Sequence, residues 1–143
     1  MNASASTASE PVPIFDNAAG SVWFVPSGAY VRLNWSSDPV PSEVWRQLLE
    51  QVLVPLEGQS WSKLLGDQRM MPVFATENQA WILIDWLPRA VRAGLHYGAI
   101  VAPQNVMTRL ETAALLREFN TYPLLYRIFA DEAVAINWLM QQP

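Results

Sequence analysis

Apolar and polar residues alternate in two short segments near the start of the chain. These segments, SVWFV (21–25) and AYVRLNW (29–35), are rich in valine and aromatic residues, and a period of two is typical of β-strands with one buried face. The residues between them, PSG (26–28), favour a turn. The pattern predicts a β-hairpin, and the polar half of its second strand indicates the edge of a sheet rather than its middle.

Apolar residues recur at helical spacing in the next segment, SEVWRQLLEQVLVPLEG (42–58). We expect Ser42 to cap this helix, because a serine oxygen accepts hydrogen bonds from N–H groups of the first turn. Pro55 and Gly58 are expected to end it. An apolar run at 63–66 then predicts a short strand, which leads into the polar residues Asp67, Gln68 and Arg69.

The segment ATENQAWILIDWLPRAVRAG (75–94) has the clearest helical pattern of the chain. Thr76 and Gln79 have the spacing of a capping box, in which both side chains bond to the backbone of the first turn. Pro88 lies inside the pattern, where it removes a backbone donor and crowds the preceding turn. The sequence therefore predicts one helix over 76–93 with a kink near residues 84–88.

Two more strands and two more helices follow. HYGAIVAP (96–103) is nearly continuously apolar, as is typical of a central strand covered on both faces. A helix is predicted at 106–120, where Thr108 and Glu111 have capping-box spacing. LLYRIFAD (124–131) predicts a strand and DEAVAINWLMQQ (131–142) a helix. The order β-β-α-β-α-β-α-β-α predicts an α/β fold, with a mixed sheet of about five strands, parallel in its later part, covered by about four helices.

The length of the chain favours a single domain. We assign residues 14–143 of the 143-residue chain to it. The first thirteen residues, MNASASTASEPVP, are small and polar and are interpreted as a disordered leader, because they lack the apolar core of a secretory signal. Apolar runs are also shorter than the roughly 18 residues of a membrane-spanning helix. We expect a cytoplasmic protein.

Charge and residue types argue against several functional classes. The formal net charge is −4, and the basic residues form no stripe that would bind nucleic acid. The chain has no cysteine and one histidine, His96, so the usual metal ligands and a thiolate nucleophile are missing. Nucleophile elbows, phosphate-binding loops and dinucleotide motifs are also missing. We expect no enzyme activity, cofactor or metal site, and a structural role for His96.

The candidate binding residues lie after the 63–66 strand and along the following helix. Asp67 and Arg69 occupy the rim at which open α/β sheets tend to bind ligands, and a local salt bridge is the alternative interpretation. Seven tryptophans are difficult to bury completely in a chain of this size, so one or two, with Trp81 first, are expected at a surface. The proposed binding residues are Asp67, Arg69, Met70, Met71, Trp81, Trp86 and Arg89.

Several of these segments resemble the SpoIIAA-like branch of the STAS domains, a bacterial group. The similarity covers about residues 14–140, and its most specific parts are Asp67 with Arg69, WLPR (86–89), and FADEA (129–133) before Trp138. The resemblance implies an α/β sandwich without enzyme activity. It further implies regulation of another protein, or the holding of a small or lipidic ligand.

The resemblance also implies a candidate phosphorylation site. In the anti-sigma-factor antagonists of the wider group, a partner kinase phosphorylates a serine at the start of the helix after the third strand. The matching neighbourhood here is Ala75, Thr76 and Glu77, although the Asp-Ser-Ser-Gly-Leu pattern of those proteins is absent. A phosphate there would meet unpaired backbone donors. Since the capping box accounts for Thr76, we interpret this residue as a cap.

Two functions remain as the main alternatives, and an enzyme whose titratable residues meet only in the folded chain is a third. In the first, the protein is a non-enzymatic module that binds another protein, or a second copy as a homodimer, through an aromatic-rich surface near residues 70–89. In the second, it carries a small apolar or lipidic ligand between the kinked helix and the sheet.

Overall fold

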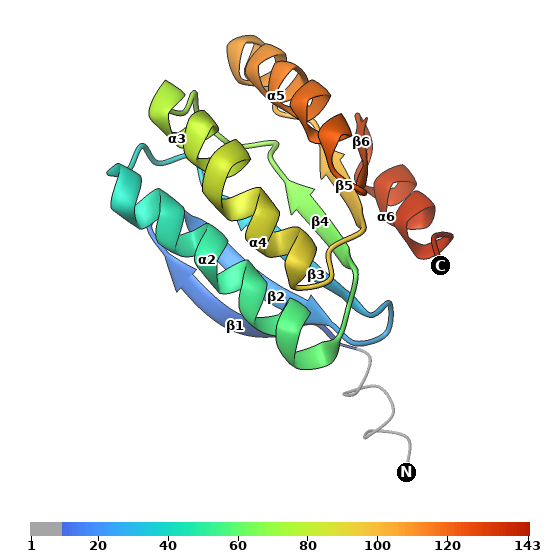
Figure 1. The fold of residues 1–143 in the computed structure, drawn as a ribbon. Helices are drawn as coiled ribbons and strands as arrows, with labels where there is room; N and C mark the ends of the chain where they lie inside the picture. The colour runs from blue at the N-terminus through green and yellow to red at the C-terminus, as the bar shows by residue number, and fades with distance from the viewer. Residues whose placement is uncertain (1–9) are drawn as a thin grey trace.

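A computed structural model describes residues 10–143. Six strands form one mixed sheet in sequence order (Figure 1). Neighbouring strands are antiparallel from β1 to β3 and parallel from β3 to β6. The strands are β1 (Val12–Asn17), β2 (Gly20–Val25), β3 (Tyr30–Trp35), β4 (Lys63–Asp67), β5 (Tyr97–Val101) and β6 (Leu125–Phe129).

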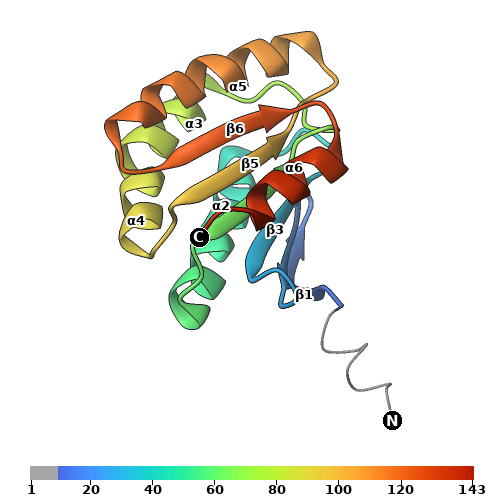
Figure 2. The same cartoon turned by 90° about the vertical axis from the view of Figure 1, so that its right-hand side faces the viewer.

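Four helical segments cover the sheet. Three of them connect parallel strands and lie on one face, whereas the last lies on the opposite face (Figure 2). The segments are α2 (Ser42–Gln59), the continuous rod of α3 (Thr76–Trp81), η1 (Ile82–Trp86) and α4 (Leu87–Arg92), then α5 (Val106–Glu118) with the short turn η2 (Phe119–Thr121), and α6 (Glu132–Met140). The predicted α/β fold, with a mixed sheet and about four helices, is confirmed.

The start of the sheet differs from the prediction. The additional strand β1 begins at Val12, inside the predicted leader, and residues 1–9 of that leader lie outside the described part of the chain. The prediction that 29–35 forms a sheet edge is wrong, because β3 pairs with β2 on one side and with β4 on the other. The polar residues of β3 therefore lie in the middle of the sheet.

The main apolar core lies between the sheet and the three connecting helices. Val31, Leu33 and Trp35 of β3 point into it, as the alternation predicts, and meet Leu48 and Val52 of α2. A smaller core lies under α6, where Ala135 and Leu139 pack on the other face of the sheet. Among the described residues, no helix is both long and apolar enough to cross a membrane.

Pro88 interrupts the predicted helix through a π-helical turn. In η1 the N–H of Leu87 donates to the carbonyl of Ile82, five residues earlier. With this register, no backbone N–H is needed at residue 88. Pro88 therefore lies in the first turn of α4, where its missing N–H is tolerated. A π turn thus lies where the kink was predicted, although a bend of the helix axis stays a prediction, and π turns commonly occur at functional positions.

Three predicted helix ends are wrong. Pro41 precedes α2 without a side-chain cap from Ser42, and α2 continues through Pro55 to Gln59 because Leu53 and Leu56 are buried on either side of the proline. Helix α5 begins at Val106, so Asn105 is its cap and accepts a hydrogen bond from the Thr108 N–H at 3.0 Å. Burial of the residues around Pro55 allows α2 to continue past the proline, and Asn105 rather than Thr108 caps α5.

Candidate functional site

Helix α6 covers only half of its face of the sheet. It packs on β4, β5 and β6 and reaches the Val25 end of β2 and the Tyr30 end of β3, and in Figure 2 no other helix of residues 10–143 covers the rest of β1, β2 and β3 on this side. We call this uncovered half, together with its border at α6, the open face. Antiparallel strands can have one face packed on the core and the other in contact with solvent. The side chains of the open face are therefore available for contact with another molecule.

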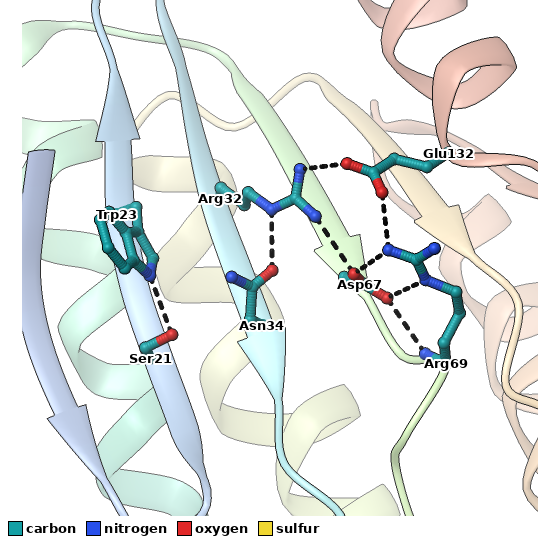
Figure 3. Close-up of polar contacts among 7 residues, drawn as sticks. All are labelled: Ser21, Trp23, Arg32, Asn34, Asp67, Arg69 and Glu132. Carbon is teal, nitrogen blue, oxygen red and sulfur yellow. Dashed lines mark hydrogen bonds and ion pairs between the residues drawn. The ribbon is translucent and has the colours of Figure 1, made fainter. Parts of the chain in front are cut away.

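Four side chains of β2 and β3 lie next to one another on the open face. Trp23 pairs with Arg32, and Ser21 pairs with Asn34, across the two antiparallel strands. Cross-strand partners share a face, and Figure 3 shows all four together. The Trp23 indole is only partly buried, and its Nε1–H donates to Ser21 Oγ at 2.9 Å.

A network of four charged groups joins this surface to α6 (Figure 3). Arg32 donates to Asp67 at 3.1 Å and to Glu132 at 2.8 Å. Arg69 donates to the same two carboxylates, at 2.7 Å to Asp67 and 2.6 Å to Glu132. The network is neutral overall and connects β3, β4, the loop after β4, and the start of α6.

The arginines hold both carboxylates of the network in the ionised state. Burial alone would raise the pKa of Asp67, but hydrogen bonds from Arg69 and the charges of Arg69 and Arg32 outweigh it, so the pKa lies below its usual range. Hydrogen bonds from Arg32 lower the pKa of Glu132 in the same way. Neither carboxylate is suited to act as a general acid near neutral pH.

Most nitrogens of the network already donate hydrogen bonds within the protein. The Nε–H of Arg32 donates to Asn34 Oδ1 at 2.8 Å, and its other two nitrogens bond to the carboxylates. Among the described residues, Arg69 Nη1 and Asn34 Nδ2 have no hydrogen-bond partner. Beside Arg69, an open groove of about 430 Å³ runs along the start of α6, lined by Ala130, Asp131, Glu132, Ala133 and Ile136.

The structure places the predicted binding residues in four separate regions. Asp67 and Arg69 lie together at the border of the open face. Met70 is exposed in the loop after β4, whereas Met71 is 3% exposed and belongs to the main core. Trp86 is also buried there, and its Nε1–H donates to the Leu49 carbonyl at 2.8 Å. Met71 and Trp86 are thus inaccessible to a partner.

Trp81 and Arg89 lie over α2, away from the open face. Arg46 stacks on the Trp81 ring, 5.1 Å from its centroid. Arg89 pairs with Glu50 of α2 and also with Asp85, four residues earlier in the chain, at 2.7 Å. The segment 70–89 therefore does not form one continuous aromatic surface.

The capping box at Thr76 is wrong. Ala75 precedes α3 and no side chain caps the helix, so Thr76 is an exposed residue of its first turn. A side-chain cap must come from the residue before the helix, and that residue is alanine. Phosphorylation of Thr76 remains a prediction from the resemblance. His96 is exposed, with its Nδ1 3.0 Å from the Leu95 carbonyl.

Five members of the open face were missed by sequence reasoning: Ser21, Trp23, Arg32, Asn34 and Glu132. Arg32 lies on the polar side of the β3 alternation, and Glu132 lies in the FADEA segment. The sequence contains no pattern that indicates a contact between these two residues. Within residues 10–143, no cluster of three or more histidine, cysteine, aspartate or glutamate side chains has the arrangement of a metal site.

Comparisons with protein-family models, curated proteins and solved structures found no match to this chain. The resemblance to STAS domains therefore rests on the residues quoted above and on the order of the elements.

Proposed function

We propose that the protein is a non-enzymatic module that binds another protein through the open face. The observation that carries this proposal is the partly exposed Trp23 ring on an uncovered sheet surface, next to the unused donors of Asn34 and Arg69. Tryptophan and arginine are enriched among the residues that contribute most to protein interfaces. A sheet face also offers a rigid platform, because its strands are fixed by backbone hydrogen bonds.

The geometry of the open face defines the chemistry of the partner. Trp23 and Asp67 lie two strands apart, about 10 Å, so about three residues of an extended segment span the distance between them. An apolar side chain of this segment would lie on Trp23. A carboxylate or carbonyl of the same segment would accept from Arg69 Nη1, which has no hydrogen-bond partner among the described residues, whereas every nitrogen of Arg32 already donates one hydrogen bond within the protein.

A site-specific photo-crosslinking experiment tests this proposal. A photoreactive amino acid at Asn34 is compared with one at Gln47, an exposed residue of α2 on the opposite side of the sheet. We expect a protein crosslinked in source cells from position 34 and not from position 47. Trp23→Ala and Arg69→Met should each reduce the yield at least fivefold. A second copy of the chain as the crosslinked partner would identify a homodimer.

Two results would contradict the proposal. The first is an equal yield from positions 34 and 47, which would indicate nonspecific contact. The second is a partner whose yield is unchanged in Trp23→Ala. Arg92→Met serves as the matched control for Arg69→Met, because Arg92 is an exposed arginine on α4, away from the open face.

A further inference from the structure

Two small cavities lie near the carboxyl ends of β3 and β4, one in the main core and one between that core and the surface loops. The first, of about 60 Å³, lies between the sheet and the helical segments α2, η1 and α5. The second, of about 90 Å³, lies under the loops that precede α2 and α3. The carboxyl ends of parallel strands are the usual position of ligand sites in open α/β sheets.

Three aromatic rings form the wall between the two cavities. Trp35, Trp45 and Phe74 line both of them. The ring of Trp45 lies 5.0 Å from that of Trp35 and 5.4 Å from that of Phe74, measured between centroids, and the Trp45–Phe74 pair is stacked. Displacement of one ring would join the cavities into a single space.

Phe74 has the weakest backbone support of the three rings. Trp35 belongs to β3 and Trp45 to α2, whereas Phe74 lies in the segment 72–75, which has no regular secondary structure. Among the described residues, the N–H groups of Val73, Phe74 and Ala75 donate to no backbone carbonyl. The Phe74 side chain, 7% exposed, is therefore the main anchor of this segment.

The size of the joined space limits the ligand. Apolar cavities of about 150 Å³ take up benzene in other proteins, and the two cavities together approach this volume. Pockets for drug-sized molecules measure about 300–1,000 Å³. A single aromatic ring in the place of Phe74 therefore fits.

The first cavity has one polar end. Thr112, 2% exposed, donates from Oγ1 to Gln68 Oε1 at 3.0 Å, and both residues line the cavity. Since a hydroxyl has two acceptor positions, Thr112 Oγ1 can also accept a hydrogen bond from a ligand. The other lining groups are mostly aromatic or aliphatic, so the site favours a flat ring with one donor.

We propose that the two cavities form one binding site for a small planar aromatic molecule with a single hydroxyl or ring N–H, which enters by displacing Phe74. The ligand ring takes the place of Phe74 against Trp45, and its donor reaches Thr112. This site lies on the opposite face of the sheet from the proposed protein-binding surface. It does not depend on that surface.

Calorimetric titration with phenol tests the proposal on the full chain. We expect saturable binding to the wild type and at least tenfold tighter binding to Phe74→Ala, in which the wall is already open. Gly66→Val should abolish binding. Gly66 lines the first cavity, and a Cβ there would have Ile100 Cγ1 as its nearest neighbour at 3.9 Å, so a small side chain fills space without a clash.

The controls separate the site from general effects. Gly58→Val on α2 has no atom within 4 Å of its new Cβ and should leave binding unchanged. Thr112→Val should weaken phenol binding at least threefold and leave benzene binding unchanged. Absence of phenol binding to both the wild type and Phe74→Ala, with both folded by circular dichroism, would overturn the proposal. Binding retained in Gly66→Val would overturn it equally, and equal affinity in Phe74→Ala would overturn the role of Phe74.

Discussion

The two faces of the sheet differ in how they use the same strand. On one face, Val31 and Leu33 of β3 are buried against α2. On the other, the alternate residues Arg32 and Asn34 are held by polar contacts, with charged partners for Arg32. The first face gains stability from burial of apolar area. On the second face, polar side chains bond to the start of α6, and the Trp23 ring stays partly exposed. This arrangement is expected of a binding surface.

The largest predicted effect compares one substitution on the two faces. Trp86→Ala removes a ring that is 2% exposed together with the indole donor to the Leu49 carbonyl. We expect it to lower the free energy of unfolding by about 3–5 kcal/mol. Trp23→Ala should cost about 1 kcal/mol or less, because the ring is partly exposed on an uncovered surface.

Urea denaturation followed by circular dichroism measures both variants. Trp86→Phe is the control that keeps most of the ring while removing the indole donor, and its cost should fall between the other two. If Trp23→Ala destabilises the protein as much as Trp86→Ala, the open face is a structural surface. The protein-binding proposal would then lose its basis.

A smaller effect is predicted for the charged network. Asp67→Asn removes the charge that faces Arg32 and Arg69, and we expect a loss of about 2 kcal/mol at pH 7, since hydrogen bonds to charged groups contribute about 1.5–3 kcal/mol. Glu57→Gln, an exposed change on α2, should cost less than about 0.5 kcal/mol. Equal effects of the two substitutions would show that the network adds nothing to stability.

The same network predicts the direction of the pH dependence. Folding lowers the pKa of Asp67 and of Glu132, so the stabilisation is complete above their unfolded values, about pH 4. It is lost as the pH falls through the lower folded values. The unfolding free energy of the wild type should therefore decrease more steeply below about pH 4 than that of Asp67→Asn. Parallel curves would contradict this assignment.

Strands and helices were predicted correctly in segments where apolar residues recur with a single clear period. The hairpin of β2 and β3 and the long helical segments have such periods. Strand β1 was missed because Pro11 and Pro13 weaken its strand character and a register shift between Pro13 and Phe15 breaks the alternation. Both features are typical of protected edge strands, so the edge of the sheet lies at β1 and not at β3.

The site was less predictable than the fold because its members meet only in space. Asp67 and Arg69 are neighbours in the sequence and were identified together. Arg32 and Glu132 are 100 residues apart, and no local pattern connects them. The polar half of β3 indicated solvent, whereas the structure shows that its arginine is neutralised by groups from β4 and α6.

The smallest predicted effect separates a real helix cap from an apparent one. Asp131 caps α6, on the open face, by accepting from the Val134 N–H at 3.1 Å, whereas Thr76, on the covered side, caps nothing. We expect Asp131→Ala to cost about 1 kcal/mol and Thr76→Ala less than about 0.3 kcal/mol, since threonine to alanine at an exposed helix position slightly favours the helix. Ala75→Asp should supply the missing cap and stabilise the protein by about 0.5–1 kcal/mol. Thermal unfolding of the three variants measures these differences. If Thr76→Ala lowers the stability as much as Asp131→Ala does, Thr76 is a helix cap after all, and the capping box explains the threonine at this position.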